Sequence, residues 1–162
     1  MPIFLFKPEQ MLIGKLAKSA YKPFHPNDKI LIEKNLKNLL GLKLLYSNYY
    51  DDDGNILADT IAVDKEGTIC FIGYKKTLKD DVFKRYQKQI EAIKAHSFEF
   101  LQQAQQLARR DDLNMYRCKL ILISSMYSHQ EIEAAKNFEF PCELYTWSLV
   151  GDILIFDKVK SK

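Results

Sequence analysis

The fold is decided by residues 56–76, ILADTIAVDKEGTICFIGYKK, which contain two strand-like apolar runs separated by a Lys-Glu-Gly turn. Apolar runs of this length that are bounded by turn residues are typical of buried strands. The second run ends on Gly73-Tyr74-Lys75, so that a lysine lies two positions after a glycine. We therefore predict two paired strands, with Lys75 at the end of the second one.

A third strand is predicted just before this pair. Residues 42–50, LKLLYSNYY, form another strand-like run, and the segment DDDGN at 51–55 connects it to the first run of the pair. Asp-Gly is a strong signal for a reverse turn between strands. The sequence therefore predicts a meander of three strands.

Helical patterns lie on both sides of this meander. Apolar residues at helical spacing predict a helix that is capped by Asn27 or Asp28 and ends at Gly41. The longest pattern, with Tyr86 among its apolar positions, predicts one helix over residues 79–109. Upstream, MPIFLF predicts a first strand, and residues 8–21 predict a first helix.

Three strands and one helix are predicted in the last third of the chain. CKLILISS (118–125) has the continuous apolar character of a central strand, and SHQEIEAAKNF (128–138) reads as a helix capped by Ser128. CELYTWSLV (142–150) and DILIF (152–156) predict a final hairpin. The element order predicts an α/β fold, with a mixed β-sheet flanked by helices in a single domain over residues 1–162.

Composition excludes several classes of protein. The chain has 162 residues, 47% of them hydrophobic, and a net charge of +3, which neither establishes nor opposes a nucleic-acid partner. The spacing of its Cys and His residues suits no zinc site, and no apolar run is long enough to cross a membrane. We predict a reduced cytoplasmic protein without a signal peptide, in which Cys70, Cys118 and Cys142 are packed thiols.

Three segments carry a family resemblance. They are IEKNLKNLLGLKLL (32–45), ADTIAVDKEGTICFIGYKK (58–76) and LKDDVFKRYQKQIEAI (78–93). In this order they resemble the PD-(D/E)xK, or restriction-endonuclease-like, nuclease superfamily, and in particular the C-terminal catalytic domain of the NucS-type endonucleases. The resemblance covers roughly residues 28–157 and implies an αβββαβ core, to which this chain adds an N-terminal strand and helix and a C-terminal hairpin.

The resemblance also implies a Mg²⁺ site. In such enzymes an Asp on the second meander strand and a Glu on the third bind the metal ion, and a Lys two positions later positions or activates water. Asp59 matches the Asp and Lys75 the Lys, so both are candidate catalytic residues. Glu33, on the first core helix, matches an acidic residue that supports the metal. Asp59 and Glu33 are thus the candidate ligands.

Two positions depart from this pattern. Gly73 stands where the metal-binding Glu is expected, and Arg85 where this branch carries Gln. Mg²⁺ needs the charge of its few protein ligands, so the loss of one carboxylate weakens the site, and a fixed cation beside it repels the ion. Asp81 and Asp64 are the candidates for a carboxylate that has migrated from another position.

A basic stripe gives the best signal for nucleic-acid binding. Its residues are Lys75, Lys76, Lys79, Lys84, Arg85 and Lys88. Such a patch would bind phosphates independently of base sequence. Purely structural alternatives remain: a solvated charged face, a plain ion pair between Asp59 and Lys75, and an i,i+4 pair between Glu33 and Lys37.

Three functional hypotheses follow from the residues and the resemblance. The first is a nucleic-acid-binding or accessory module with an impaired metal site, with DNA favoured as the partner and a homodimer as one arrangement. The second is a Mg²⁺-dependent DNA endonuclease or exonuclease with a migrated carboxylate. The third is a protein-interaction scaffold that has kept only the fold.

Overall fold

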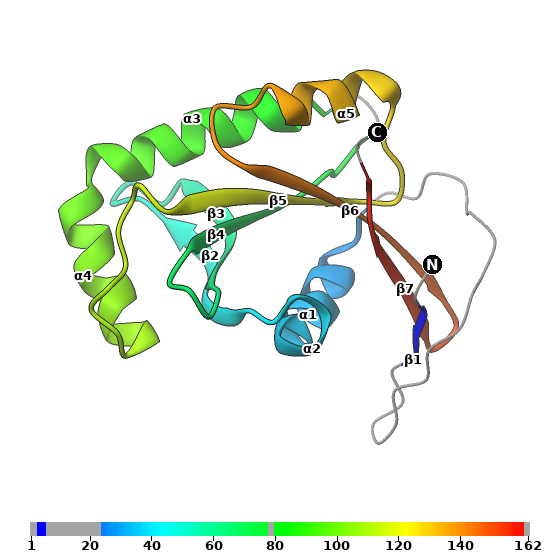
Figure 1. Cartoon of the computed structure of the whole chain (residues 1–162), viewed down its shortest axis with the longest axis horizontal. Helices are drawn as coiled ribbons and strands as arrows, with labels where there is room; N and C mark the ends of the chain where they lie inside the picture. The colour runs from blue at the N-terminus through cyan, green and yellow to red at the C-terminus, as the bar shows by residue number, and fades with distance from the viewer. Residues whose placement is uncertain (1–2, 6–23, 78–79, 161–162) are drawn as a thin grey trace.

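The predicted meander forms one end of a mixed β-sheet. We describe a computed structural model, which covers residues 3–5, 24–77 and 80–160 (Figure 1). Strands β2 (Lys43–Tyr50), β3 (Ile56–Val63) and β4 (Ile69–Tyr74) are antiparallel neighbours. In the β3–β4 register Thr60 lies opposite Ile72, so the next position in the same register sets Asp59 opposite Gly73.

The rest of the sheet continues from β4. Strand β5 (Cys118–Ser124) is parallel to β4, and β6 (Cys142–Val150) is parallel to β5. Strand β7 (Ile153–Lys158) completes the predicted hairpin, and the short β1 (Ile3–Leu5) pairs with it. The sheet order within the described residues is β1-β7-β6-β5-β4-β3-β2. The predicted α/β class with a mixed sheet is confirmed.

Two predicted helices are each divided in two. The first consists of α1 (Pro26–Lys34) and α2 (Leu36–Leu40), and the long one of α3 (Val82–Ala95) and α4 (Ser97–Ala108). The predicted cap of α1 is wrong: His25 caps it by accepting from Asn27 N, while Asp28 accepts from His25 N. Gly41 is the predicted C-cap, with a left-handed φ of 67°. The helix predicted over 8–21 lies outside the described residues.

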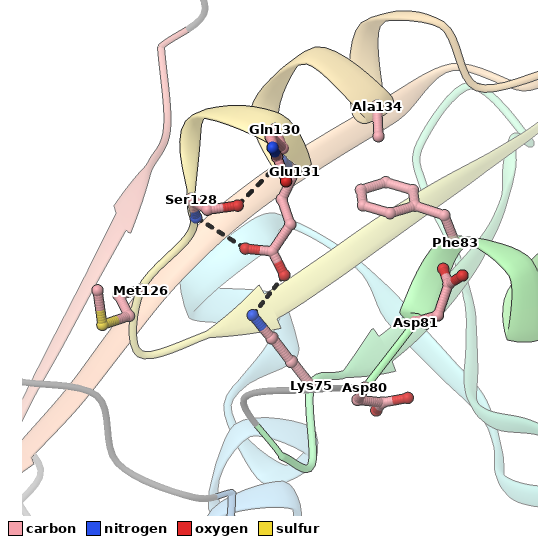
Figure 2. A pocket seen from close by; sticks show the side chains of 9 residues that line it. All are labelled: Lys75, Asp80, Asp81, Phe83, Met126, Ser128, Gln130, Glu131 and Ala134. Carbon is pink, nitrogen blue, oxygen red and sulfur yellow. Dashed lines mark hydrogen bonds and ion pairs between the residues drawn. The ribbon is translucent and has the colours of Figure 1, made fainter.

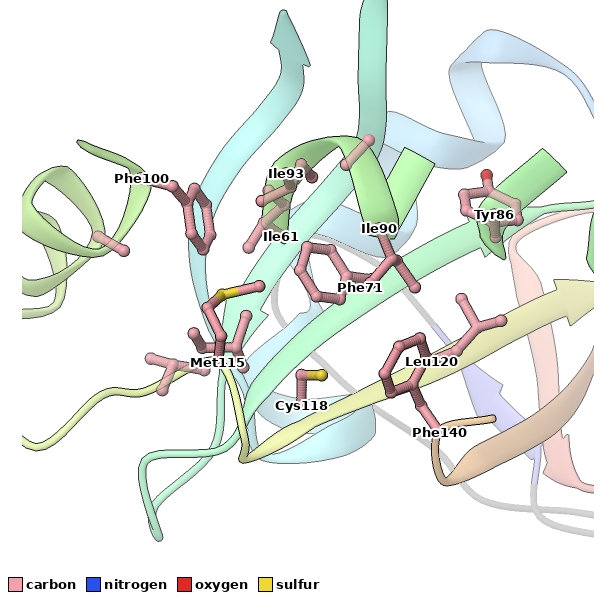
Figure 3. Packing of buried hydrophobic residues seen from close by; sticks show 14 of the residues in the cluster. Ile61, Phe71, Tyr86, Ile90, Ile93, Phe100, Met115, Cys118, Leu120 and Phe140 are labelled. Carbon is pink, nitrogen blue, oxygen red and sulfur yellow. The ribbon is translucent and has the colours of Figure 1, made fainter. Parts of the chain in front are cut away.

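Helices cover the sheet on both faces. On one face α3, α4 and α5 (His129–Lys136) pack over a core that includes Ile61 and Phe71, which Figure 3 shows. On the other face α1 and α2 cover a second core, which includes Tyr74. Because side chains alternate along a strand, the two core faces separate neighbouring residues of β3 and β4.

All three cysteines are free thiols in the structure. Cys70 and Cys118 are buried and Cys142 is half-buried. Within the described ranges, no helix has the length and apolar character needed to cross a membrane.

Candidate functional site

Asp59 lies within β3, Lys75 directly follows the end of the neighbouring β4, and both are nearly buried. Their exposed fractions are 5% and 3%. Asp59 forms an ion pair with Lys76, with 3.5 Å between Oδ1 and Nζ, and Lys75 forms one with Glu131 of α5. The alternative of a cross-strand pair between Asp59 and Lys75 is therefore replaced by two pairs with other partners.

The space beside Gly73 is filled by the ring of Tyr86, from α3. A Cβ atom placed on Gly73 would lie 2.2 Å from Cζ of that ring, well inside van der Waals contact. Tyr86 donates its hydroxyl hydrogen to Asp59 and accepts a hydrogen bond from Tyr74 N at 3.2 Å. The position at which the resemblance expects a metal-binding Glu is thus occupied by a phenol.

The Tyr86 hydroxyl is a permanent donor at physiological pH. Burial, together with the negative charge of Asp59, raises the pKa of Tyr86 well above its ordinary range. A neutral phenol beside a carboxylate satisfies a buried oxygen that would otherwise need water or a cation. Tyr86 therefore stabilises Asp59 in the way that a metal ion or a lysine could, without bringing a positive charge.

Glu33 lies on the opposite face of the sheet from Asp59. Its carboxylate accepts hydrogen bonds from Thr60 at 2.6 Å and from Ser47 at 2.8 Å. Thr60 follows Asp59 directly, and its hydroxyl also contacts the Tyr74 hydroxyl at 2.9 Å in the second core. The ion pair of Glu33 is with Lys29, one turn earlier, rather than with Lys37.

The structure thus does not bring the two predicted metal ligands together. Asp59 and Glu33 are separated by strand β3 itself, since successive side chains point to opposite faces. Across the described part of the chain, no group of three or more His, Cys, Asp or Glu side chains is arranged to hold a metal ion.

Lys75 instead lines a hollow of about 500 Å³ between the starts of α3 and α5. Figure 2 shows its ammonium reaching from the end of β4 to Glu131, whose other oxygen accepts from Ser128 N at 2.7 Å. Asp81 also lines this hollow and caps α3 by accepting from Lys84 N at 3.2 Å. Asp64 lies at the opposite end of β4 from Lys75, in the turn between β3 and β4. There it accepts a hydrogen bond from Thr68 N.

Arg85 forms its ion pair with Asp80 rather than with Asp59. Its guanidinium donates to Asp80 at 2.6 Å and to the Tyr74 carbonyl at 3.1 Å, and it lies 5.0 Å from the centre of the Tyr86 ring. These contacts fix Arg85 over the ring that fills the Gly73 space. The guanidinium therefore helps to hold that ring in place.

Three residues of the predicted basic stripe are paired with acids. Lys75 is buried against Glu131, Arg85 pairs with Asp80, and Lys76 is half-exposed but pairs with Asp59. Lys84 and Lys88 are exposed on α3, and neither forms an ion pair with another described residue. Lys79 lies outside the described residues.

Two residues of this site were not predicted in their roles. Tyr86 was expected only as an apolar position of a helix, and its hydroxyl gives no separate sequence signal. Glu131 could have been found, because it lies three residues after Ser128 in the Ser-x-x-Glu pattern of a capping box, at the start of the helix that follows the strand beside β4.

Comparison with known proteins adds no assignment: no family model, curated protein or solved structure matches this chain.

Proposed function

We propose that the chain is a restriction-endonuclease-like module that binds nucleic acid without hydrolysing it. Support for this fold assignment comes from the order of elements, in which α1 and α2 precede an antiparallel meander and α3 leads to a parallel fourth strand. The same order characterises the αβββαβ core that the three resembling segments imply.

The observation that supports binding without hydrolysis is the position of the Tyr86 ring, which lies against Gly73. Metal-dependent phosphodiester cleavage needs carboxylates that converge on a cation, which then stabilises the charge that develops on the phosphate. Here a buried phenol takes the place of one carboxylate and satisfies Asp59 by hydrogen bonding. Tyr86 holds one carboxylate oxygen of Asp59 and Lys76 pairs with the other, so a Mg²⁺ ion would have to displace these partners.

The binding function rests on the exposed lysines around the start of α3. Lys84 and Lys88 are one helical turn apart on α3. Lys76, which precedes α3 in the sequence, has a side chain that is 53% exposed. Lysines on an open helix face contact phosphates electrostatically and independently of base sequence. Such a surface would hold a nucleic acid along α3, the helix that carries Tyr86.

The test is fluorescence anisotropy of labelled single-stranded and duplex DNA with the full chain in EDTA. We expect binding that weakens with salt, and the Lys84→Ala/Lys88→Ala variant should lower the salt slope by about two. Lys136→Ala, an exposed lysine of α5, is the control and should leave the slope unchanged.

Two outcomes would contradict this function. If DNA does not bind even at low salt, the remaining hypothesis is the protein-interaction scaffold. Cleavage that needs Mn²⁺ and is lost in Asp59→Ala would establish the migrated-carboxylate nuclease, with Asp81 and Lys75 in their common hollow as its first candidates.

A further inference from the structure

A second hollow lies at the other end of β3 and β4 from Lys75. Its volume is about 630 Å³, and its walls come from the end of α1, from α2, from the start of β2, from the turn between β3 and β4, and from the end of α4. This size falls within the range of small-molecule sites. We refer to it as the basic hollow, for the charges described next.

Cations outnumber acids around the basic hollow. Five cationic side chains and two carboxylates line it: Lys34, Lys37, Lys43, Lys65, Arg110, Glu33 and Asp64. Both acids already accept hydrogen bonds, Glu33 from Thr60 and Ser47, and Asp64 from the backbone N–H groups of Glu66 and Thr68. Both carboxylates thus already have donors of their own, and the five cations still outnumber them.

The five cations fall into two groups. Lys43 donates to the Ala108 carbonyl at 3.2 Å, and Arg110 donates to the carbonyls of Asp64 and Lys65 and to Asp112. These two side chains hold the walls together. Lys34, Lys37 and Lys65 are exposed and form no ion pair with any other described residue.

The floor of the basic hollow is apolar. Leu36, Leu42 and Val63 line it with exposed fractions of 1%, 3% and 3%, and Ala108 adds a methyl group. Burying apolar ligand surface against such a floor is favourable, whereas a bare inorganic ion would gain nothing from it. A molecule that matches both the lysines and this floor combines an anionic group with a small apolar or aromatic body.

We propose that the basic hollow binds a phosphate monoester. A phosphate monoester carries a charge of about −1.5 to −2 at neutral pH, which matches lysines from two walls better than a single carboxylate does. Lys34 and Lys37 approach from α1 and α2, and Lys65 approaches from the β3–β4 turn. The monoester could be a free metabolite or the 5′-phosphate end of a nucleic acid, because both present the same group.

The test is calorimetric titration of the full chain with adenosine 5′-monophosphate, with adenosine and inorganic phosphate as comparison ligands. We expect the monophosphate to bind at least about tenfold more tightly than either comparison ligand. Lys37→Gln/Lys65→Gln should weaken this binding by about tenfold or more. Lys84→Gln/Lys88→Gln removes the same charge from α3 and should change it by less than about twofold.

Oligonucleotides with a 5′-phosphate or a 5′-hydroxyl separate the two sources of the group. Tighter binding of the phosphorylated end, lost in Lys37→Gln/Lys65→Gln, indicates a nucleic-acid terminus, and binding of the mononucleotide alone indicates a metabolite. Either result supports the proposal. Because Lys84 and Lys88 are varied separately, a failure of DNA binding at α3 leaves this result intact.

The proposal is overturned if adenosine binds as tightly as its monophosphate, if no monophosphate binding is seen, or if both lysine pairs weaken it equally. Circular dichroism checks that each variant is folded. Lys34→Gln/Lys65→Gln provides a second pair from the same two walls, should the first variant fail that check.

Discussion

Gly73 and Tyr86 are complementary residues, since the missing side chain of one makes room for the ring of the other. The ring contacts the strand backbone closely enough that any Cβ atom at position 73 would overlap it. A Glu at position 73 and a buried Tyr86 therefore exclude each other in this fold. Gly73 and the phenol buried beside Asp59 therefore form one structural unit.

Gly73→Ala tests this complementarity. We predict a loss of about 1–3 kcal/mol in the free energy of unfolding, because the ring must move within a packed core. Urea unfolding measures the loss. In the Tyr86→Leu background the same substitution should cost much less, since the shorter side chain leaves room. An equal cost in both backgrounds would show that Tyr86 is not what fills the Gly73 space.

The ion pair between Lys75 and Glu131 is a second residue-scale feature, and it is largely desolvated. Lys75 is 3% exposed and Glu131 18%. We predict that Glu131→Gln lowers the free energy of unfolding by about 3 kcal/mol, because it removes the carboxylate that faces a buried ammonium. Lys75→Met/Glu131→Gln should recover part of this loss, since it removes both charges.

A neighbouring pair on the same helix gives the control for this cycle. Lys136 and Glu133 form an ion pair at 2.7 Å in which both side chains are at least one-third exposed. Glu133→Gln should cost less than about 1 kcal/mol, because exposed ion pairs contribute little. If Glu131→Gln is as mild as Glu133→Gln, the buried pair does not constrain Lys75.

At the scale of elements, the start of α5 connects helix capping to the candidate site. The Ser128 hydroxyl accepts from Glu131 N at 3.2 Å, and Glu131 accepts from Ser128 N at 2.7 Å. We predict that Ser128→Ala lowers the free energy of unfolding by about 1 kcal/mol through the lost cap. Chemical denaturation measures this value, and an unchanged stability would contradict the role of Ser128 as the cap.

The strands were predictable because their signals are local. The apolar runs of β3, β4 and β5 stop at turn residues, and Asp-Gly marks the turn between β2 and β3. The helix breaks at Asn35 and His96 were missed, because the apolar spacing continues through both and neither position carries Pro or Gly. Local pattern therefore predicts where helical residues lie better than where one helix ends and the next begins.

The partners within the site could not be predicted in the same way. Glu131 is 56 positions from Lys75, and the two meet only because β4 and β5 are parallel and α5 starts above the end of β5. The burial of Tyr86 was predicted from helical periodicity, but its hydrogen bond to Asp59 depends on how α3 is rotated over the sheet. The spacing of residues in the sequence does not predict such tertiary contacts.

At the scale of the whole molecule, buried thiol and phenol groups predict a loss of stability at alkaline pH. Burial raises the pKa of the Cys70 thiol from 9.0 to about 12. Below pH 9 both the folded and the unfolded chain keep this proton. Above it only the unfolded chain releases it, so the free energy of unfolding falls by about 1.4 kcal/mol per pH unit from this group until the folded thiol ionises.

Urea unfolding between pH 8 and pH 11 measures this slope. Tyr86 adds to it above pH 10, because its pKa is raised in the folded chain as well. Cys70→Val replaces the thiol with an apolar side chain of similar size and should reduce the slope above pH 9 by the contribution of one group. An identical slope in the variant would show that the Cys70 thiol does not titrate differently on folding.

The most direct test of the arrangement of Asp59, Gly73 and Tyr86 is anomalous diffraction from crystals of the chain soaked in Mn²⁺. We predict no manganese peak within coordination distance of Asp59, and we expect the Tyr86 ring to lie against Gly73 with its hydroxyl on the carboxylate. A manganese ion bound to Asp59, with the ring displaced from β4, would contradict it.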